Sequence, residues 1–330
     1  MNKKRNSVCA AVSLVLLFSA AILSLALGSV RLSPERLAAA ISGTDINASV
    51  ILFDLRLPRL AAAMLAGCAL AAAGFLLQTV TDNDLCAPNI VGVNSGAGLF
   101  VMLMLCFFPM QWRLQPIVAF VGALGATVIV LSVSHASSRY DSSSSVVLAG
   151  AAISSFLSAG ISFLSLKFPD VLSSYLGFTV GGFSGVSFKK LLVPFIMIAL
   201  CYAVSLMLSP KISLLSLGDD CASSLGVNVK RLRAVTIILA SALCAAVVSF
   251  AGLLGFVGLI VPHIVRRTVR GSLRIKLLFA AVFGAVLTSF SDLIGRTLFS
   301  PSELPAGLIM SLVGAPFFVY LLLRRRKEND

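Results

Sequence analysis

The stretch Leu60–Thr81 reads LAAAMLAGCALAAAGFLLQTVT and contains no charged residue. An α-helix of about 20 apolar residues crosses the hydrocarbon core of a bilayer, so this stretch predicts a membrane-spanning helix. The whole chain has the same character: 58% of its 330 residues are hydrophobic and 12% are charged, against about 25% charged residues in soluble domains. We therefore expect an all-α polytopic membrane protein. The composition excludes a soluble enzyme, a secreted disulfide scaffold and a disordered chain.

Uncharged runs of similar length recur on both sides of this stretch. The 32 uncharged residues of Ala234–Val265 are too long for one upright helix, and the glycines in their second half indicate two helices that meet near Ala251. About ten spans are expected in all: Ser7–Val30, Leu60–Thr81, Val93–Phe108, Leu114–Ser138, Ser142–Leu166, Leu191–Pro210, Ala234–Ala251, Leu254–Val269, Leu277–Ser291 with an extension past Asp292, and Leu304–Leu323.

The distribution of basic residues favours an even number of spans. Both Lys3–Arg5 and Arg324–Lys327 are basic, and basic segments favour the cytoplasmic side, so we expect both termini in the cytoplasm. Ten spans place 17 of the 26 Lys and Arg residues on that side. Clusters of this kind explain the net charge of +13 without nucleic acid as a partner. The first apolar run exceeds the h-region of a signal peptide, about 7–15 residues, and is expected to be retained.

Motifs for chemistry within the membrane are missing from the sequence. It contains no GxxxxGK[ST], HExxH or GxSxG pattern, and its seven cysteines form no CxxC pair. We therefore expect no catalytic residue, metal site or cofactor in this chain. The middles of the spans also lack the charged residues with which ion-coupled carriers bind protons or sodium. A partner subunit would then supply the energy for transport; an ion-coupled secondary transporter and a structural or sensory membrane protein are the competing hypotheses.

Three groups of motifs are more specific. The first comprises RLPR at 56–59, NDLCAPNI at 83–90 and GVNSGA at 92–97. The second is LGDDCASSLGV at 217–227, and the third joins GFVGLIVPHI at 255–264 to Asp292, Arg296, ELP at 303–305 and GAPF at 314–317. In this order they closely resemble the FecCD-type, or type II, permeases of ABC importers for ferric siderophores, haem and cobalamin. The resemblance extends from about Arg56 to Leu323.

This resemblance implies a single transmembrane permease domain over residues 1–330 with the type II ABC importer permease fold. It implies a dimer with a second permease copy or a paralogue, two cytoplasmic ABC ATPases that bind ATP-Mg, and an extracytoplasmic substrate-binding protein, all at a bacterial inner membrane. The implied cargo is an iron chelate, and a ferric siderophore is preferred. Haem, cobalamin and molybdate are the alternatives.

The second motif has the features of a short helix within about 211–231. Two acidic residues after Gly218 suit a helix N-terminus, and Gly226 suits the end of that helix. If Leu225 is exposed, it suits a groove on another subunit. A solvated connector explains these residues equally well. The resemblance favours ATPase coupling through Leu217, Gly218, Asp219, Asp220, Ala222, Leu225, Gly226 and Val227.

Three arginines lie on the outer side in this topology, where arginine side chains can also extend toward lipid phosphates. In the resembling family, arginines at the positions of Arg56, Arg59 and Arg296 receive acidic residues of the binding protein. The planar guanidinium suits this role because it binds a carboxylate with two parallel hydrogen bonds. We expect these three residues to dock the binding protein.

The resemblance also suggests gate or pathway residues. Ser143 and Ser144 fall where the family narrows its inner gate, with a flexible linker as the alternative. Gly181 and Gly182 lie in a stretch that resembles the family's short outer helix and loop near the cargo entrance.

Two positions depart from the family pattern. Relatives usually have proline in place of Asp84, and many have proline in place of Leu253. We expect Asp84 to alter the inner loop near the ATPase contact.

Overall fold

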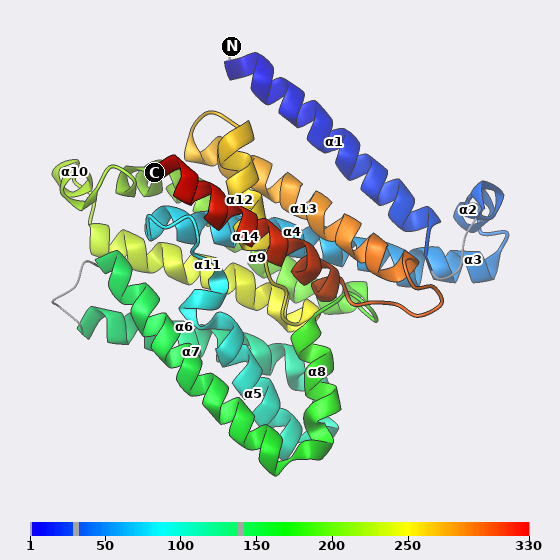
Figure 1. The fold of residues 1–330 in the computed structure, drawn as a ribbon. Coiled ribbons are helices and arrows are strands. Elements are labelled where there is room, and N and C mark those ends of the chain that lie inside the picture. The colour runs from blue at the N-terminus through cyan, green and yellow to red at the C-terminus, as the bar shows by residue number, and fades with distance from the viewer. Residues whose placement is uncertain (1, 29–32, 137–141, 330) are drawn as a thin grey trace.

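The computed structural model describes residues 2–28, 33–136 and 142–329, and within these ranges it contains helices and loops without any strand (Figure 1). The helices follow one another as α1 (Asn2–Ala26), α2 (Pro34–Ile41), α3 (Ile46–Val50), the π-helix η1 (Ile51–Arg56), α4 (Leu57–Val80), the 3-10 helix η2 (Pro88–Val91), α5 (Val93–Phe107), the 3-10 helix η3 (Pro109–Leu114), α6 (Gln115–Ala136), α7 (Ser142–Lys167), the 3-10 helix η4 (Pro169–Val171), α8 (Leu172–Val180), α9 (Phe188–Leu215), α10 (Asp219–Ser224), α11 (Val229–Ala251), α12 (Val257–Thr268), α13 (Leu273–Thr297) and α14 (Ala306–Asn329).

The prediction of an all-α fold with about ten spans is confirmed. Among the described residues, seven helical segments are long and apolar enough to cross a membrane, and Val93–Phe107 and Ala306–Tyr320 are shorter apolar helices. Ten helices correspond in chain order to the ten expected spans. They are α1, α4, α5, α6, α7, α9, α11, the shorter α12, α13 and α14. Figure 1 places α10 at one end of the helical body, here called the inner end, and α2 and α3 at the opposite, outer end.

Two spans differ in extent from the sequence prediction. The second apolar helix starts well before Leu60, because α3, η1 and α4 continue into one another over Ile46–Val80. The eighth span begins at Val257 instead of near Leu254. Residues 252–256 leave the helical path there, with positive φ angles of 70° at Gly252 and 66° at Phe256.

The helix α4 lies at the centre of the fold and is buried along most of its length. It crosses α13 where Gly67 faces Gly284, and it crosses α12 where Gly74 faces Gly258. A Cβ atom on any of these four glycines would collide with the backbone of the facing helix. Lipid gives helices no hydrophobic reason to associate, so close packing of small residues holds such spans together.

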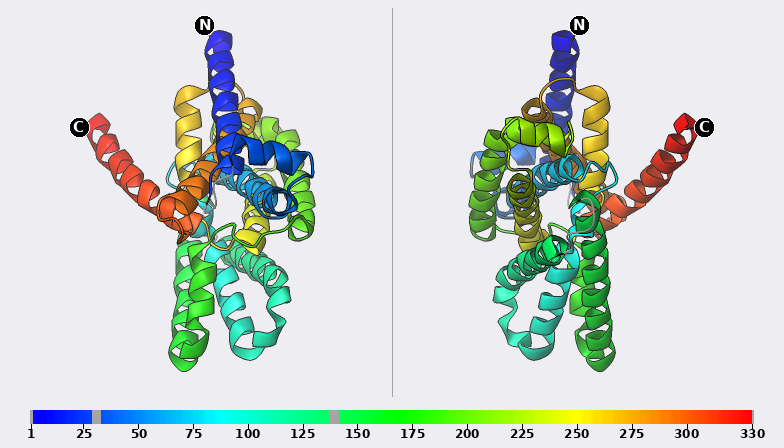
Figure 2. Two further views of the ribbon diagram at one scale, coloured as in Figure 1. Left: turned by 90° about the vertical axis from the view of Figure 1, so that its right-hand side faces the viewer. Right: turned by 90° about the vertical axis from the view of Figure 1, so that its left-hand side faces the viewer.

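Helices at the periphery of the body are packed much less tightly than α4. Only 17% of the apolar window of α7 is buried, and the same fraction holds for α1. Both views of Figure 2 show the C-terminal half of α14 diverging from the rest of the molecule. Faces of α7 and α14 are therefore free to contact lipid or another subunit.

The glycine contact between α4 and α12 gives a direct test. We expect Gly74→Ala to lower the melting temperature of the detergent-solubilised protein, because overpacking a tight contact costs about 1–3 kcal/mol. The matched control is Gly125→Ala on α6, where an added Cβ meets no atom within 4 Å. Equal melting temperatures for the two variants would contradict the close approach of α4 to α12.

Candidate functional site

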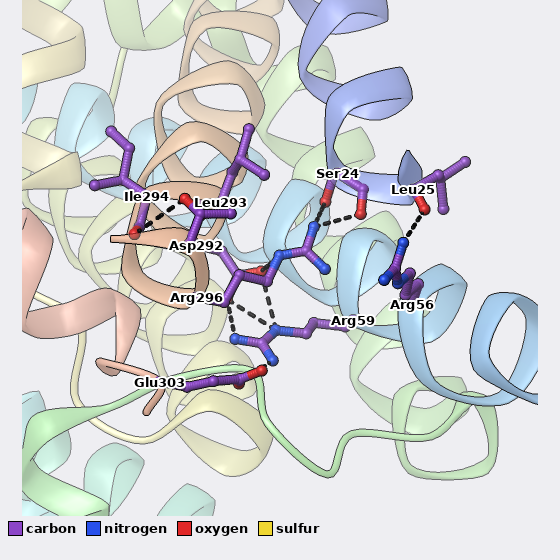
Figure 3. A network of polar contacts seen from close by, with 10 residues as sticks. Ser24, Leu25, Arg56, Arg59, Asp292, Leu293, Ile294, Arg296 and Glu303 are labelled. Atoms are coloured by element: carbon purple, nitrogen blue, oxygen red, sulfur yellow. Dashed lines mark hydrogen bonds and ion pairs between the residues drawn. The ribbon is translucent and has the colours of Figure 1, made fainter. Parts of the chain in front are cut away.

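At the outer end the structure gathers the three predicted arginines with two acidic residues (Figure 3). We call Arg56, Arg59, Asp292, Arg296 and Glu303 the arginine cluster. Arg56 ends η1, and Arg59 lies in the first turn of α4. Asp292 and Arg296 are one turn apart on α13, and Glu303 lies in the loop that leads to α14. Two helices and one loop that are far apart in the sequence therefore meet here.

Arg59 binds both carboxylates of the cluster. Its Nε donates to both carboxylate oxygens of Asp292 at 3.0 Å, its Nη2 donates to Oδ1 of Asp292 at 2.9 Å, and its Nη1 donates to Oε2 of Glu303 at 2.6 Å. The Asp292 side chain is 1% exposed, that of Arg59 is 13% exposed and that of Glu303 is 31% exposed. The pair with Asp292 is thus an interior pair, whereas Glu303 approaches Arg59 from the solvent side.

The other two arginines are buried against the end of α1. Arg56 donates to the carbonyl oxygen of Leu25, and Arg296 donates to the carbonyl oxygen and the hydroxyl of Ser24. Carbonyl groups in the last turn of a helix lack partners within that helix, and the helix dipole favours positive charge there. Arg56 is 5% exposed and Arg296 is 3% exposed. Their docking role stays a prediction, and Arg59 is the most accessible of the three.

Two cavities adjoin the arginine cluster. A cavity of about 440 Å³ is lined by Arg59 and Glu303 together with Gly181, Gly182 and Pro305. A second cavity of about 320 Å³ is lined by all three arginines and Glu303. The predicted pathway residues Gly181 and Gly182 therefore face an outer cavity. The side chains of Ser143 and Ser144 lie outside the described residues.

The loop at 181–182 belongs to a junction of non-helical backbone. The N–H of Gly182 donates to the carbonyl of Ala251 at 2.8 Å, and the N–H of Gly307 donates to the carbonyl of Gly181 at 3.2 Å. Leu253, where the family resemblance predicts proline, donates its N–H to the carbonyl of Phe178 at 3.1 Å. A proline at 253 has no N–H, so this chain makes a contact between α8 and the start of the 252–256 segment that a proline would lose.

At the inner end, α10 is a short helix with defined ends. Its cap at the C-terminus is a Schellman motif: Gly226 has a φ of 81° and donates to Ser223, and the N–H of Val227 donates to Ala222. Ala222 is fully buried, whereas Leu217 and Leu225 are largely exposed. The predicted helix, its glycine end and the exposure of Leu225 are therefore present in the structure.

The two acidic residues of α10 differ in their surroundings. Asp219 binds Arg233 of α11 with two hydrogen bonds of 2.9 and 3.2 Å, and Arg233 is buried. Asp220 points to solvent. Arg233 was not among the residues predicted for ATPase coupling. The charge pattern of an acid on the short helix and a basic residue one turn into the next helix was the available signal.

Another ion pair lies at the C-terminal end of α12. Asp84, in the loop after α4, pairs with Arg266, whose guanidinium carbon also lies 5.2 Å from the centre of the Phe75 ring. Asp84, where the family resemblance predicts proline, thus supplies a carboxylate that ties the inner loop to α12. Its effect on an ATPase contact stays a prediction.

Comparisons with known proteins show the family of this chain. A model of the FecCD transport family matches residues 15–324. The "Fe(3+)-citrate import system permease protein YfmE" of Bacillus subtilis (strain 168) is 35% identical over 97% of this chain and 96% of its own. The "Probable heme-iron transport system permease protein IsdF" of Staphylococcus aureus (strain MSSA476) is 34% identical over 96% of this chain and 95% of its own.

Solved structures share the fold. "An inward-facing conformation of a putative metal-chelate type ABC transporter" matches with a TM-score of 0.86 at 30% identity, over 96% of this chain and 99% of the other. "PsaBC from Streptococcus pneumoniae in complex with Fab" matches with a TM-score of 0.60 at 18% identity, over 86% of this chain and 94% of the other. The second likeness concerns the fold alone.

The buried acid of the arginine cluster is expected to be essential for stability. Asp292→Asn would leave Arg59 and Arg296 without their interior counter-charge, and loss of one partner of a buried pair costs about 3–5 kcal/mol. Thermal unfolding in detergent should show a strongly lowered melting temperature. Asp54→Asn, on the exposed side of η1, is the control and should unfold like the unaltered chain. A stable Asp292→Asn variant would mean that the cluster does not depend on this carboxylate.

The pair between Asp219 and Arg233 predicts a local effect. Asp219→Asn should speed amide hydrogen exchange in α10 about fivefold, which corresponds to about 1 kcal/mol for a partly exposed ion pair. Asp220→Asn makes the same change of charge at the neighbouring exposed position and should leave the exchange rate unchanged. Mass spectrometry of the exchanged protein measures both. Equal rates in the two variants would show that the pair does not hold α10.

Proposed function

The chain belongs to the FecCD transport family, and from this premise we propose that it moves an iron chelate across the membrane as the permease subunit of an ATP-driven importer. The observation that carries the proposal is near full-length similarity, at 34–35% identity, to permeases named for ferric citrate and for haem iron. Both cargoes hold iron within an organic chelate. A ferric siderophore-type chelate belongs to the same chemical class and is the cargo we propose.

The exposed surface of α10 supports coupling to a separate ATPase. A permease that moves cargo against a gradient needs an energy source, and the sequence holds no nucleotide-binding motif. The helix presents Leu217 and Leu225 to solvent, while Ala222 and the pair between Asp219 and Arg233 fix its inner face to α11. Two exposed leucines on a helix that is held in place suit an apolar groove in another subunit. We place an ABC ATPase carrying ATP-Mg at this surface. The inner end of the permease and both of its termini would then face the cytoplasm of a bacterial cell.

The opposite end suits an extracytoplasmic binding protein with acidic contact residues. The arginine cluster holds three guanidinium groups and two carboxylates, so it retains one positive charge. Arg59 is its most accessible base, while Arg56 and Arg296 attach the cluster to α1. Docking there would seat the cargo above the cavity lined by Gly181 and Gly182.

A second permease subunit, identical or paralogous, would complete the pathway. The apolar faces of α7 and α14 are poorly buried within one chain, and both helices bear small or apolar residues at their exposed positions, including Ala151, Ser155 and Leu312. ATP-driven motion of the two ATPases would reach each permease through α10 and its attachment to α11. The pathway between the two copies would then open to either side in turn.

The test is uptake by proteoliposomes that contain this chain, its ATPase and its binding protein. We expect ATP-dependent accumulation of ⁵⁵Fe-labelled ferric siderophore that ionophores do not abolish. Leu225→Asp should reduce uptake at least tenfold, since it places a charge on the apolar docking surface, whereas Ile46→Asp, at an exposed position on α3, should not. Uptake that is independent of ATP and collapses with an ionophore would identify an ion-coupled carrier and reject the proposal.

A further inference from the structure

Glu303 differs from the other members of the arginine cluster in its position. Asp292, Arg296 and Arg56 are buried, and Arg59 is nearly so. The Glu303 side chain is 31% exposed and reaches Arg59 from the loop before α14 (Figure 3). Its hydrogen bond with Nη1 of Arg59, at 2.6 Å, uses the guanidinium nitrogen to which Asp292 is not bonded. Glu303 therefore occupies the face of Arg59 that an approaching molecule would meet.

The pair between Arg59 and Glu303 is shared by the two outer cavities, as is Ser184. Both residues line the cavity of about 440 Å³ and the cavity of about 320 Å³. The residues that follow, Leu304 and Pro305, line the larger cavity, and Leu304 donates its N–H to the carbonyl of Gly295 at 2.8 Å. A movement of Glu303 away from Arg59 would therefore alter the lining of both cavities while the loop stays attached to α13.

Charge defines what can replace Glu303. Without it, the cluster holds three guanidinium groups against one carboxylate, and Nη1 of Arg59 loses its acceptor. A partly buried guanidinium nitrogen without an acceptor is costly, so an anionic oxygen such as that of another carboxylate is the favoured replacement. Asp292 would continue to hold the Nε and Nη2 edge of Arg59 in the same orientation.

We propose that Glu303 is an internal stand-in for an acidic side chain of the binding protein, which displaces it from Arg59 on docking. This inference rests on the proposed function, in which the arginine cluster receives the binding protein. Docking is then an exchange of one carboxylate for another. Competition with Glu303 weakens the complex and permits its release, and the displaced Glu303 alters the lining of both outer cavities only when the binding protein is seated.

The experiment measures binding of the binding protein to the permease–ATPase complex in nanodiscs, using the binding protein that supports uptake in the proteoliposome assay. Glu303→Gln keeps the shape of the side chain and removes the competing charge, so we expect the Kd to fall about five- to tenfold. Glu35→Gln removes the same charge from the exposed helix α2 and should change the Kd less than twofold. Melting temperatures of both variants serve as the check on folding.

The possible outcomes distinguish a failure of the carboxylate exchange from a failure of docking at the arginine cluster. An unchanged or raised Kd for Glu303→Gln overturns the exchange, and an equal fall in Kd for both variants attributes the effect to overall charge and also overturns it. Arg59→Lys keeps the charge and loses the planar fork. If it weakens binding while Glu303→Gln has no effect, docking at the cluster stands and the exchange fails. If Arg59→Lys leaves the Kd unchanged, docking at Arg59 itself is wrong.

Discussion

The contact between α4 and α13 is the interaction on which the rest of the molecule depends. Along the middle of this contact, Gly67 and Gly284 bring the two backbones together, and the hydroxyl of Thr288 donates to the carbonyl of Ala63 at 2.7 Å. At its outer end, the interior pair between Arg59 and Asp292 joins the same two helices. Steric fit thus sets the distance between the helices, and the ion pair fixes their rotation, because the guanidinium meets the carboxylate in one orientation only.

This arrangement explains why both candidate sites lie at the ends of well-packed helices. The arginine cluster is built on α4 and α13, and α10 is attached to α11, which also packs against α4. A force applied to α10 would reach α4 through side chains that have little freedom to rearrange, so the central helices are suited to move as rigid units. The loosely packed α7 and α14 are the elements whose surroundings such a motion would change most.

The sequence predicts the fold well because lipid imposes simple rules on it. Uncharged length locates all ten spans, and the glycines of 252–258 predict the break between α11 and α12. The cap of α10 is equally local. The ion pairs are different: Arg59 meets Asp292 and Glu303 across 233 and 244 residues, and only the packing of α4 against α13 brings them together. The burial of Arg56 and Arg296 against the end of α1 was also outside the reach of a local pattern.

The half-length helix α12 has a consequence for the history of this chain. Twelve residues rise about 18 Å, which is less than the hydrocarbon core of about 30 Å, and the segment before α12 is non-helical. The N–H of Gly252 donates to the carbonyl of Val248 in α11, and the N–H of Leu253 donates to the carbonyl of Phe178 in α8. A single inserted residue would shift all of these partners at once. Among descendants of a common ancestor, we therefore expect residues 252–256 to vary by substitution while the number of residues between α11 and α12 stays constant.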